Sequence, residues 1–540
     1  MLLSIPKILK SLTRIEKLAL AGASAIFAFA IIFSAVSYIN KYTKVVPQSG
    51  GTYIEGILGQ PVFINPIIMS TDVDRDIINL IYDNLFDLSE SIVPSENKLV
   101  WTVRLNDNIL WHDGERLTSD DVIFTIAKIQ DNESRSPLSV TWQGVAAERV
   151  SELELKLTTG APYAFFEDNL KQLYVVPKHI FEDVPIVNWR LSNFNLQPIG
   201  SGPYKYLSFK KEKNGFISEY DLVKNKNYSG GIPFIDRVTF MFFTDSASAT
   251  RAFNSARVHG ISGIDIKNID SIMRLHKIFD LRLPNYYAIF LNQSTNSLFK
   301  NKNVRLALNY AIPKEKIIQE VFGGFASAPT GPLPLAKIQT SDQGLVNRYD
   351  VEEANKILNE SGVKLENGTR GEISLVTPEL EFLVKTADIV KESWENIGFK
   401  TNVVVLSPAI TSSEIIKTRN YEALIFGNVL SRNPDILSFW HSSERFYPGL
   451  NLSLWSNKSA DKLMESIRQN FDEKERAKDL SSLQSLVIQD MPAIFLYSPS
   501  YLYLLSTKVL GVQELIISDP SHRFQNIENW HLKTKRVWAS

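Results

Sequence analysis

The clearest signal for the fold lies in WTVRLNDNILWHDGERLTSDDVIFTIAKIQD, residues 101–131. Apolar and polar residues alternate from Leu99 to Leu105, which predicts a strand. Asp113-Gly114 then favours a tight turn. Thr118 has Asp121 three residues later, the capping-box spacing that begins a helix. A strand, a hairpin turn and a helix are therefore expected in this order.

The second half of the chain alternates helix and strand patterns at short intervals. A helix is predicted over 379–397, and strands over 400–406 and 422–427. Thr411 and Glu414 have capping-box spacing and predict the start of another helix. Helices that alternate with strands in this way predict sheets covered by helices, so we expect an α/β fold.

Length and composition narrow the possible functions. A chain of 540 residues exceeds the size at which one hydrophobic core stops growing, so at least two lobes are expected. The absence of cysteine excludes disulfides, thiolate metal sites and a lipidated N-terminal cysteine. A net charge of −1 argues against a nucleic-acid partner.

An uncharged run of 22 residues, LALAGASAIFAFAIIFSAVSYI, covers 18–39. As a helix it would be about 33 Å long, enough to cross a bilayer. Residues 7–17 carry four basic side chains, so the N-terminus is expected in the cytoplasm. A cleavable signal peptide, cut near 35–37, is the alternative. We favour an uncleaved anchor because the run exceeds the usual apolar region of a signal peptide.

No enzyme motif is recognisable. The seven histidines include no pair spaced i, i+4, and the sequence lacks HExxH, G-x-S-x-G, GxxxxGK[ST] and GxGxxG patterns. The string Trp111–Glu115 places a histidine beside two acids, which could support acid–base chemistry. A hairpin turn at Asp113-Gly114 is the favoured interpretation. We therefore predict no catalytic residue, no metal site and no cofactor.

Four segments resemble, in order, the extracellular solute-binding proteins of the oligopeptide and dipeptide class, family 5 of ABC importers. The hairpin and helix of 101–131 are similar to that family's signature. PIGSGPY (198–204) is similar to its P-V-G-T-G-P-Y loop, and NVRLALNYAIPKEKI (303–317) to V-R-x-A-L-x-x-A-I-D-R-E-x-I. Residues 323–332 resemble the connection that follows. Each motif is weak alone, but their common order is specific.

The resemblance implies two α/β lobes joined by crossing strands, a periplasmic-binding-protein-like clamp that follows an N-terminal transmembrane helix. The expected parts are a cytoplasmic basic tail (1–17), a transmembrane anchor (18–39), a polar tether (40–50), lobe I (51–290), lobe II (291–497) and a return to lobe I (498–540).

The resemblance also implies the function. We expect a membrane-anchored binding protein that captures peptides or peptide-like solutes outside the cytoplasmic membrane and delivers them to ABC permease subunits. A monomer is expected. The alternatives are a receptor that senses a ligand without transporting it, and a cell-wall hydrolase.

One segment departs from the family pattern. In peptide binders of this class a G-W-x-x-D segment presents main chain and an aspartate to the ligand's ammonium group. The corresponding segment here is 427–435, in which Ser431 occupies the aspartate position. Either Asp435 replaces that aspartate after a register shift, or the ligand lacks a free amino group. Asp435 is also read as a turn residue after Pro434. The expected ligand-binding residues are Gly427, Asn428, Val429, Ser431 and Asp435.

Overall fold

The computed structural model describes residues 12–264, 266–328, 330–333, 343–430, 433–513 and 517–538. Ser431 and part of the 323–332 segment lie outside this range.

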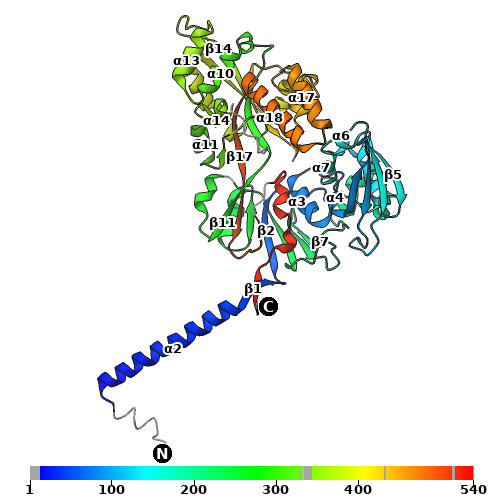
Figure 1. Ribbon diagram of the computed structural model, residues 1–540, viewed down its shortest axis with the longest axis vertical. Helices are drawn as coiled ribbons and strands as arrows, with labels where there is room; N and C mark the ends of the chain where they lie inside the picture. Colours follow the sequence, from blue (N-terminus) through cyan, green and yellow to red (C-terminus); the bar gives the residue numbers. More distant parts are fainter. Residues whose placement is uncertain are drawn as a thin grey trace, which may run out of the picture.

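The N-terminal helix projects away from the rest of the molecule (Figure 1). This helix, α2 (Arg14–Tyr42), extends beyond the expected 18–39 at both ends and has no buried residue. Thr13 and Glu16 form a capping box that begins it. Within the described residues it is the one helix long and apolar enough to cross a membrane.

The expected polar tether contains a strand. β1 (Thr43–Gln48) follows α2 directly and pairs antiparallel with β18 (Lys533–Trp538). The C-terminal end of the chain therefore returns to the point where α2 ends, as Figure 1 shows.

The lower lobe in Figure 1 contains two sheets around one core. The first runs in the order β10-β2-β9-β8-β7, and the second in the order β3-β4-β6-β5. Their strands are β2 (Thr52–Leu58), β3 (Ser89–Pro94), β4 (Val100–Leu105), β5 (Ala146–Ser151), β6 (Glu154–Thr158), β7 (Tyr204–Lys211), β8 (Ile217–Lys224), β9 (Arg237–Phe243) and β10 (Gly260–Ser262).

The strand, turn and helix expected over 101–131 are confirmed, and the strand belongs to the sheet β3-β4-β6-β5. β4 is followed by a turn at Gly114, which has φ +101°, and by α5 (Ser119–Gln130). Thr118 and Asp121 form the expected capping box. Asp121 also accepts a hydrogen bond from the backbone N–H of Lys178, at 2.8 Å, so this cap joins two segments that are distant in the sequence.

The upper lobe is a helix-covered sheet in the order β15-β14-β16-β12-β17. Its strands are β12 (Asn285–Leu291), β14 (Gly371–Pro378), β15 (Phe399–Leu406), β16 (Ala423–Val429) and β17 (Ala493–Ser506). Four helices share a core with one face: α10 (Lys302–Tyr310), α11 (Lys314–Phe322), α13 (Val351–Glu360) and α14 (Glu381–Asn396). The other face packs against α17 (Lys458–Gln469) and α18 (Glu473–Asp490).

The expected helix and strands at 379–397, 400–406 and 422–427 are confirmed within two residues at each end. The predicted helix start at Thr411 and Glu414 is wrong. The helical segment begins at Pro408, with Ser407 as its N-cap, because the Ser407 hydroxyl accepts the N–H of Ile410. The Thr411 hydroxyl instead donates back to the Ser407 carbonyl oxygen at 3.0 Å.

One strand belongs to both lobes. β17 pairs with β12 over 493–497, and then with β11 (His276–Arg282) and β10 from Ser500 onward. Pro499, which has no N–H to donate, lies where the pairing changes. Figure 1 shows β17 running from one lobe into the other.

A buried charge cluster fixes the last part of the chain to the lower lobe. Both guanidinium nitrogens of Arg523 bond the carboxylate of Asp76, at 2.6 Å each, and Arg523 also pairs with Glu55 at 3.4 Å. Asp76 lies on α3 (Asp72–Ile81) and Glu55 on β2. This contact holds residues 518–524 beside α3.

His112, the histidine that lies beside two acids in the sequence, has a structural role. His112 donates its backbone N–H to the Gly200 carbonyl oxygen at 2.8 Å and accepts the Gly200 N–H on Nδ1 at 3.2 Å. The ring proton therefore lies on Nε2, 3.1 Å from the Gly202 carbonyl oxygen. A Cβ on Gly200 would lie 1.9 Å from the carbonyl oxygen of Ile81, so this loop requires glycine for close packing. His112 thus joins the hairpin to the PIGSGPY loop.

We expect His112 to make the fold sensitive to acid. Burial lowers the pKa of His112 from 6.5 to about 4. Between these values the unfolded chain binds a proton that the folded chain excludes, so stability falls as pH decreases from 6.5 towards 4. In His112→Gln, this part of the pH dependence should disappear from the denaturation midpoint, although stability at pH 7 is reduced. An unchanged slope between pH 4 and 6.5 would contradict it.

Candidate functional site

Three cavities meet at the carboxyl end of β16. Their volumes are about 530, 640 and 280 Å³, and Val429 lines all three. Its side chain is apolar yet 70% exposed. Ligands of α/β sheets usually bind just beyond the carboxyl ends of strands. The cavities therefore form one candidate cleft with Val429 at its centre.

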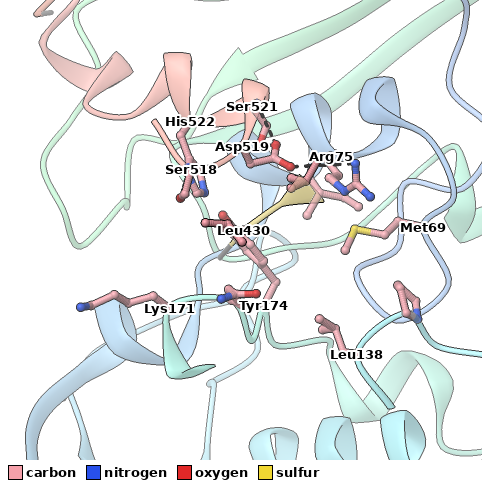
Figure 2. A pocket seen from close by; sticks show the side chains of 14 residues that line it. Met69, Arg75, Leu138, Lys171, Tyr174, Leu430, Ser518, Asp519, Ser521 and His522 are labelled. Atoms are coloured by element: carbon pink, nitrogen blue, oxygen red, sulfur yellow. Dashed lines mark hydrogen bonds and ion pairs between the residues drawn. The ribbon is translucent and has the colours of Figure 1, made fainter. Parts of the chain in front are cut away.

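The first cavity lies between the lobes. The lower lobe contributes α3 and residues 518–522, and the upper lobe contributes Val429 and Leu430. Figure 2 shows Leu430 projecting between Asp519 on one side and Tyr174 on the other. The backbone N–H of Leu430 donates to the Pro284 carbonyl oxygen at 2.7 Å, which fixes it beside the crossing strands.

Both signs of charge and an apolar surface line this cavity. Arg75 Nη1 lies 3.9 Å from Asp519 Oδ2, and Lys171 Nζ lies 3.1 Å from Asp168 Oδ1. The apolar lining comes from Met69, Ile78, Pro137, Leu138, Val429 and Leu430. Such a site can accept a ligand that carries polar main chain and apolar side chains.

The second cavity is bounded by a direct contact between the lobes. The Tyr163 hydroxyl of the lower lobe donates to Asp435 Oδ2 of the upper lobe at 3.0 Å. Arg468 of α17 pairs with the same carboxylate at 3.2 Å and lies over the Tyr163 ring. The backbone N–H of Ala164 also donates to the Arg468 carbonyl oxygen, at 2.7 Å. We call Tyr163, Asp435 and Arg468 the latch.

The latch places Asp435 in a defined ionic environment. Its side chain is mostly buried and is bonded to both Tyr163 and Arg468. Burial, reinforced by Asp435, raises the pKa of Tyr163 above its usual value, so the hydroxyl remains a donor. Asp435 therefore lines the cavity while its carboxylate is bonded to protein groups.

The third cavity is apolar and lies within the upper lobe, with a lining that includes Leu380, Leu383 and Phe426. Gly427 borders it, opposite Tyr287 of β12. A Cβ at Gly427 would lie 2.7 Å from the Tyr287 ring. The packing of this tyrosine explains the glycine without any ligand.

Asn428, another expected ligand contact, is buried. Its side-chain amide donates to the Tyr286 hydroxyl at 2.8 Å, and that hydroxyl also accepts Trp440 Nε1–H at 3.2 Å. Of the four expected residues that the structure describes, Val429 has the side chain most open to the cleft. Ser431, as noted, lies outside the described residues.

Sequence reasoning missed most of the cleft. Arg75, Lys171 and Asp519 come from three segments distant in the sequence, and none belongs to a recognisable motif. Thr71 caps α3, and a capping threonine is a signal that could have directed attention to Arg75 in the first turn of the helix. No such signal marks Tyr163 or Arg468. Among the described residues, no group of three or more metal-ligating side chains is present.

Comparisons with known proteins agree with this architecture. The model for "Bacterial extracellular solute-binding proteins, family 5 Middle" matches residues 86–445. The oligopeptide-binding protein AppA of Bacillus subtilis is 29% identical over 96% of this chain and 99% of its own. The structure of that protein with a nonapeptide superposes with a TM-score of 0.69 at 26% identity, over 90% of this chain and 100% of the other. The ABC transporter substrate-binding protein CtaP of Listeria monocytogenes gives 0.77, also at 26% identity, with the same coverage.

We expect the latch to stabilise contact between the lobes. A hydrogen bond to a charged group contributes about 1.5 to 3 kcal/mol, so Tyr163→Phe and Asp435→Asn should each increase the open fraction about tenfold. The double variant should add little to either single change. Because the chain has no cysteine, Glu148→Cys and Lys474→Cys can carry fluorophores for single-molecule energy transfer. Tyr349→Phe, at an exposed tyrosine, is the control. Additive effects would show that the pair is not coupled.

Proposed function

Because the chain belongs to family 5 of the bacterial extracellular solute-binding proteins, we propose that it captures a peptide or peptide-like solute between its lobes and delivers it to an ABC permease. The observation that carries this proposal is the cleft around Val429, to which both lobes contribute walls. A relative that aligns over nearly the whole chain is an oligopeptide-binding protein.

The binding mechanism follows from the crossing strands. A ligand that touches both lobes favours the conformation in which they are close together. Rotation about 283–285 and 498–499 would change the separation of the lobes and withdraw Phe165, a lower-lobe side chain, from the upper core. The permease then recognises the closed form. No covalent step is required, so we propose a binding protein rather than an enzyme.

We place the lobe boundaries at these crossings. The first lobe then covers 51–284 and 498–538, and the second covers 285–497. The first boundary is earlier than the expected 290/291 because β12 pairs with β16, a strand of the upper sheet. The second boundary, between 497 and 498, remains where it was expected.

We also propose that α2 crosses the cytoplasmic membrane once and holds both lobes on the outer side. Its length, its lack of buried residues and its position outside both cores support this proposal. The family is extracellular, which agrees with this topology. We propose that the protein acts as a monomer.

The function can be tested at the centre of the cleft. With a nonapeptide mixture at a hundredfold excess over Kd, the wild-type protein should gain about 2.7 kcal/mol of stability and become more compact. Val429→Trp should fill the junction of the three cavities and remove both effects. It should still fold, because Val429 is mostly exposed. Val187→Trp, at a surface valine that is 55% exposed, is the matched control. Calorimetry and small-angle scattering provide the measurements, and full ligand stabilisation of Val429→Trp would contradict the proposal.

We propose that the ligand lacks a free amino group near residue 431. The sequence has Ser431 where peptide binders of this class have aspartate, and the carboxylate of Asp435 is bonded to Tyr163 and Arg468. An ammonium group would therefore lack charge compensation in a partly desolvated cleft.

Ser431→Asp should restore that compensation and improve affinity for free-amino peptides about tenfold. N-acetylated forms of the same peptides should bind the wild-type protein more tightly than the free forms. Calorimetry of both proteins against both peptides tests this. A wild-type preference for the free peptide, unchanged in Ser431→Asp, would show that another acid pairs with the ammonium group.

A further inference from the structure

The C-terminal strand is fixed to the end of the membrane helix. In the ribbon that β1 and β18 form, Trp538 lies opposite Thr43, the first residue after α2. The Arg536 guanidinium donates to the Thr43 hydroxyl at 2.9 Å and to Asn40 Oδ1 at 2.7 Å. The ribbon therefore begins where α2 ends, at the junction between helix and lobes in Figure 1.

Three aromatic side chains gather at this junction. The Tyr38 ring lies 4.6 Å from that of Tyr42 and 6.4 Å from that of Trp538. All three are well exposed, at 57%, 43% and 67%. Tyrosine and tryptophan concentrate at the level of lipid headgroups. Trp538, from the opposite end of the chain, thus joins two tyrosines where α2 would leave the bilayer.

The ribbon is also strongly basic. Residues 40–48 and 533–538 contain five lysines and arginines and no acid. Residues directly opposite each other in an antiparallel pair share a face, and the pairs Lys44–Val537, Val46–Lys535 and Gln48–Lys533 alternate with the rest. One face therefore carries three exposed lysines. Across the described residues, none of the three forms an ion pair with a carboxylate.

We propose that this lysine face docks on anionic phospholipid headgroups and so fixes the orientation of the lobes on the membrane. The inference rests on the proposed membrane anchor. The ribbon is about 20 Å long, and its first residue pairs already lie at headgroup level. If the ribbon leans onto the bilayer, all three lysines come within a Debye length of the lipid charges.

The charge of the lysine face and the aromatic residues beside it identify an anionic membrane surface as the partner. Unpaired lysines attract anions, and the adjacent aromatic cluster favours an interface between water and hydrocarbon rather than a soluble anion. A membrane is also the surface that α2 brings next to the ribbon. Each lysine near an anionic surface should strengthen docking about fivefold, and three together about a hundredfold.

The test uses the full-length chain in lipid nanodiscs. Gln48→Cys, at the far end of the lysine face, provides a unique site for a polarity-sensitive fluorophore because the native chain has no cysteine. Its emission should shift to the blue in discs with phosphatidylglycerol, relative to discs of phosphatidylcholine alone. Added salt should reverse the shift. A second probe at Glu360→Cys, at the end of α13, should respond to neither.

Charge variants provide the second arm. Lys44→Gln, Lys533→Gln and Lys535→Gln together should abolish the shift. Lys364→Gln, Lys462→Gln and Lys474→Gln, at exposed lysines of the upper lobe, should preserve it. The same emission in both lipids, or a shift that requires the permease, would overturn lipid docking. Release of the wild-type chain from membranes at alkaline pH would instead refute the anchor. Retention without a lipid-dependent shift would refute docking alone.

Discussion

The arrangement of the two lobes depends on β17, a strand that belongs to the sheets of both. β17 completes the upper sheet through β12 and the lower sheet through β10 and β11. Both cores are therefore tied to one backbone, and within the described part of the chain the backbone crosses between the lobes near 283–285 and 498–499. Between these pairings Pro499, which cannot donate a hydrogen bond, pairs with the short strand β13 (Ala326–Ser327). Two cores joined by short crossings are the arrangement that a clamp requires.

The position of the cleft also follows from the crossing between the lobes. β12 begins and β16 ends at the crossing, so Val429 and Leu430 emerge beside Pro284, facing the lower lobe. The other wall depends on Arg523, whose buried pairing with Asp76 holds residues 518–522 next to α3. Replacing one member of such a cluster leaves an uncompensated buried charge. Loss of either partner is therefore expected to loosen this wall of the cleft.

Local chemistry was enough to predict much of the fold and little of the cleft. The β4–turn–α5 unit and the α14–β15 pair followed from alternation, turn residues and caps, all of which act within a few residues. The helix start at Thr411 was misassigned because Ser407, one turn earlier, competes for the same role. Gly427 stays a predicted ligand contact, since it borders the third cavity, and the close packing of the Tyr287 ring against it could not be foreseen from the sequence. The latch joins Tyr163 to Asp435 across 272 residues, and no short pattern encodes such a contact.

The ribbon of β1 and β18 also determines when folding of this protein can be completed. β1 follows α2 directly, whereas its partner strand β18 is synthesised only after both lobes. Until β18 has been synthesised, β1 is an unpaired edge, open to pairing with other chains. Closure of so long a loop costs little more entropy than closure of a shorter one, but it must wait for the whole chain. The junction between α2 and the lobes therefore folds only after both lobes have been made, and a chain that terminates before β18 would leave the edge of β1 uncovered.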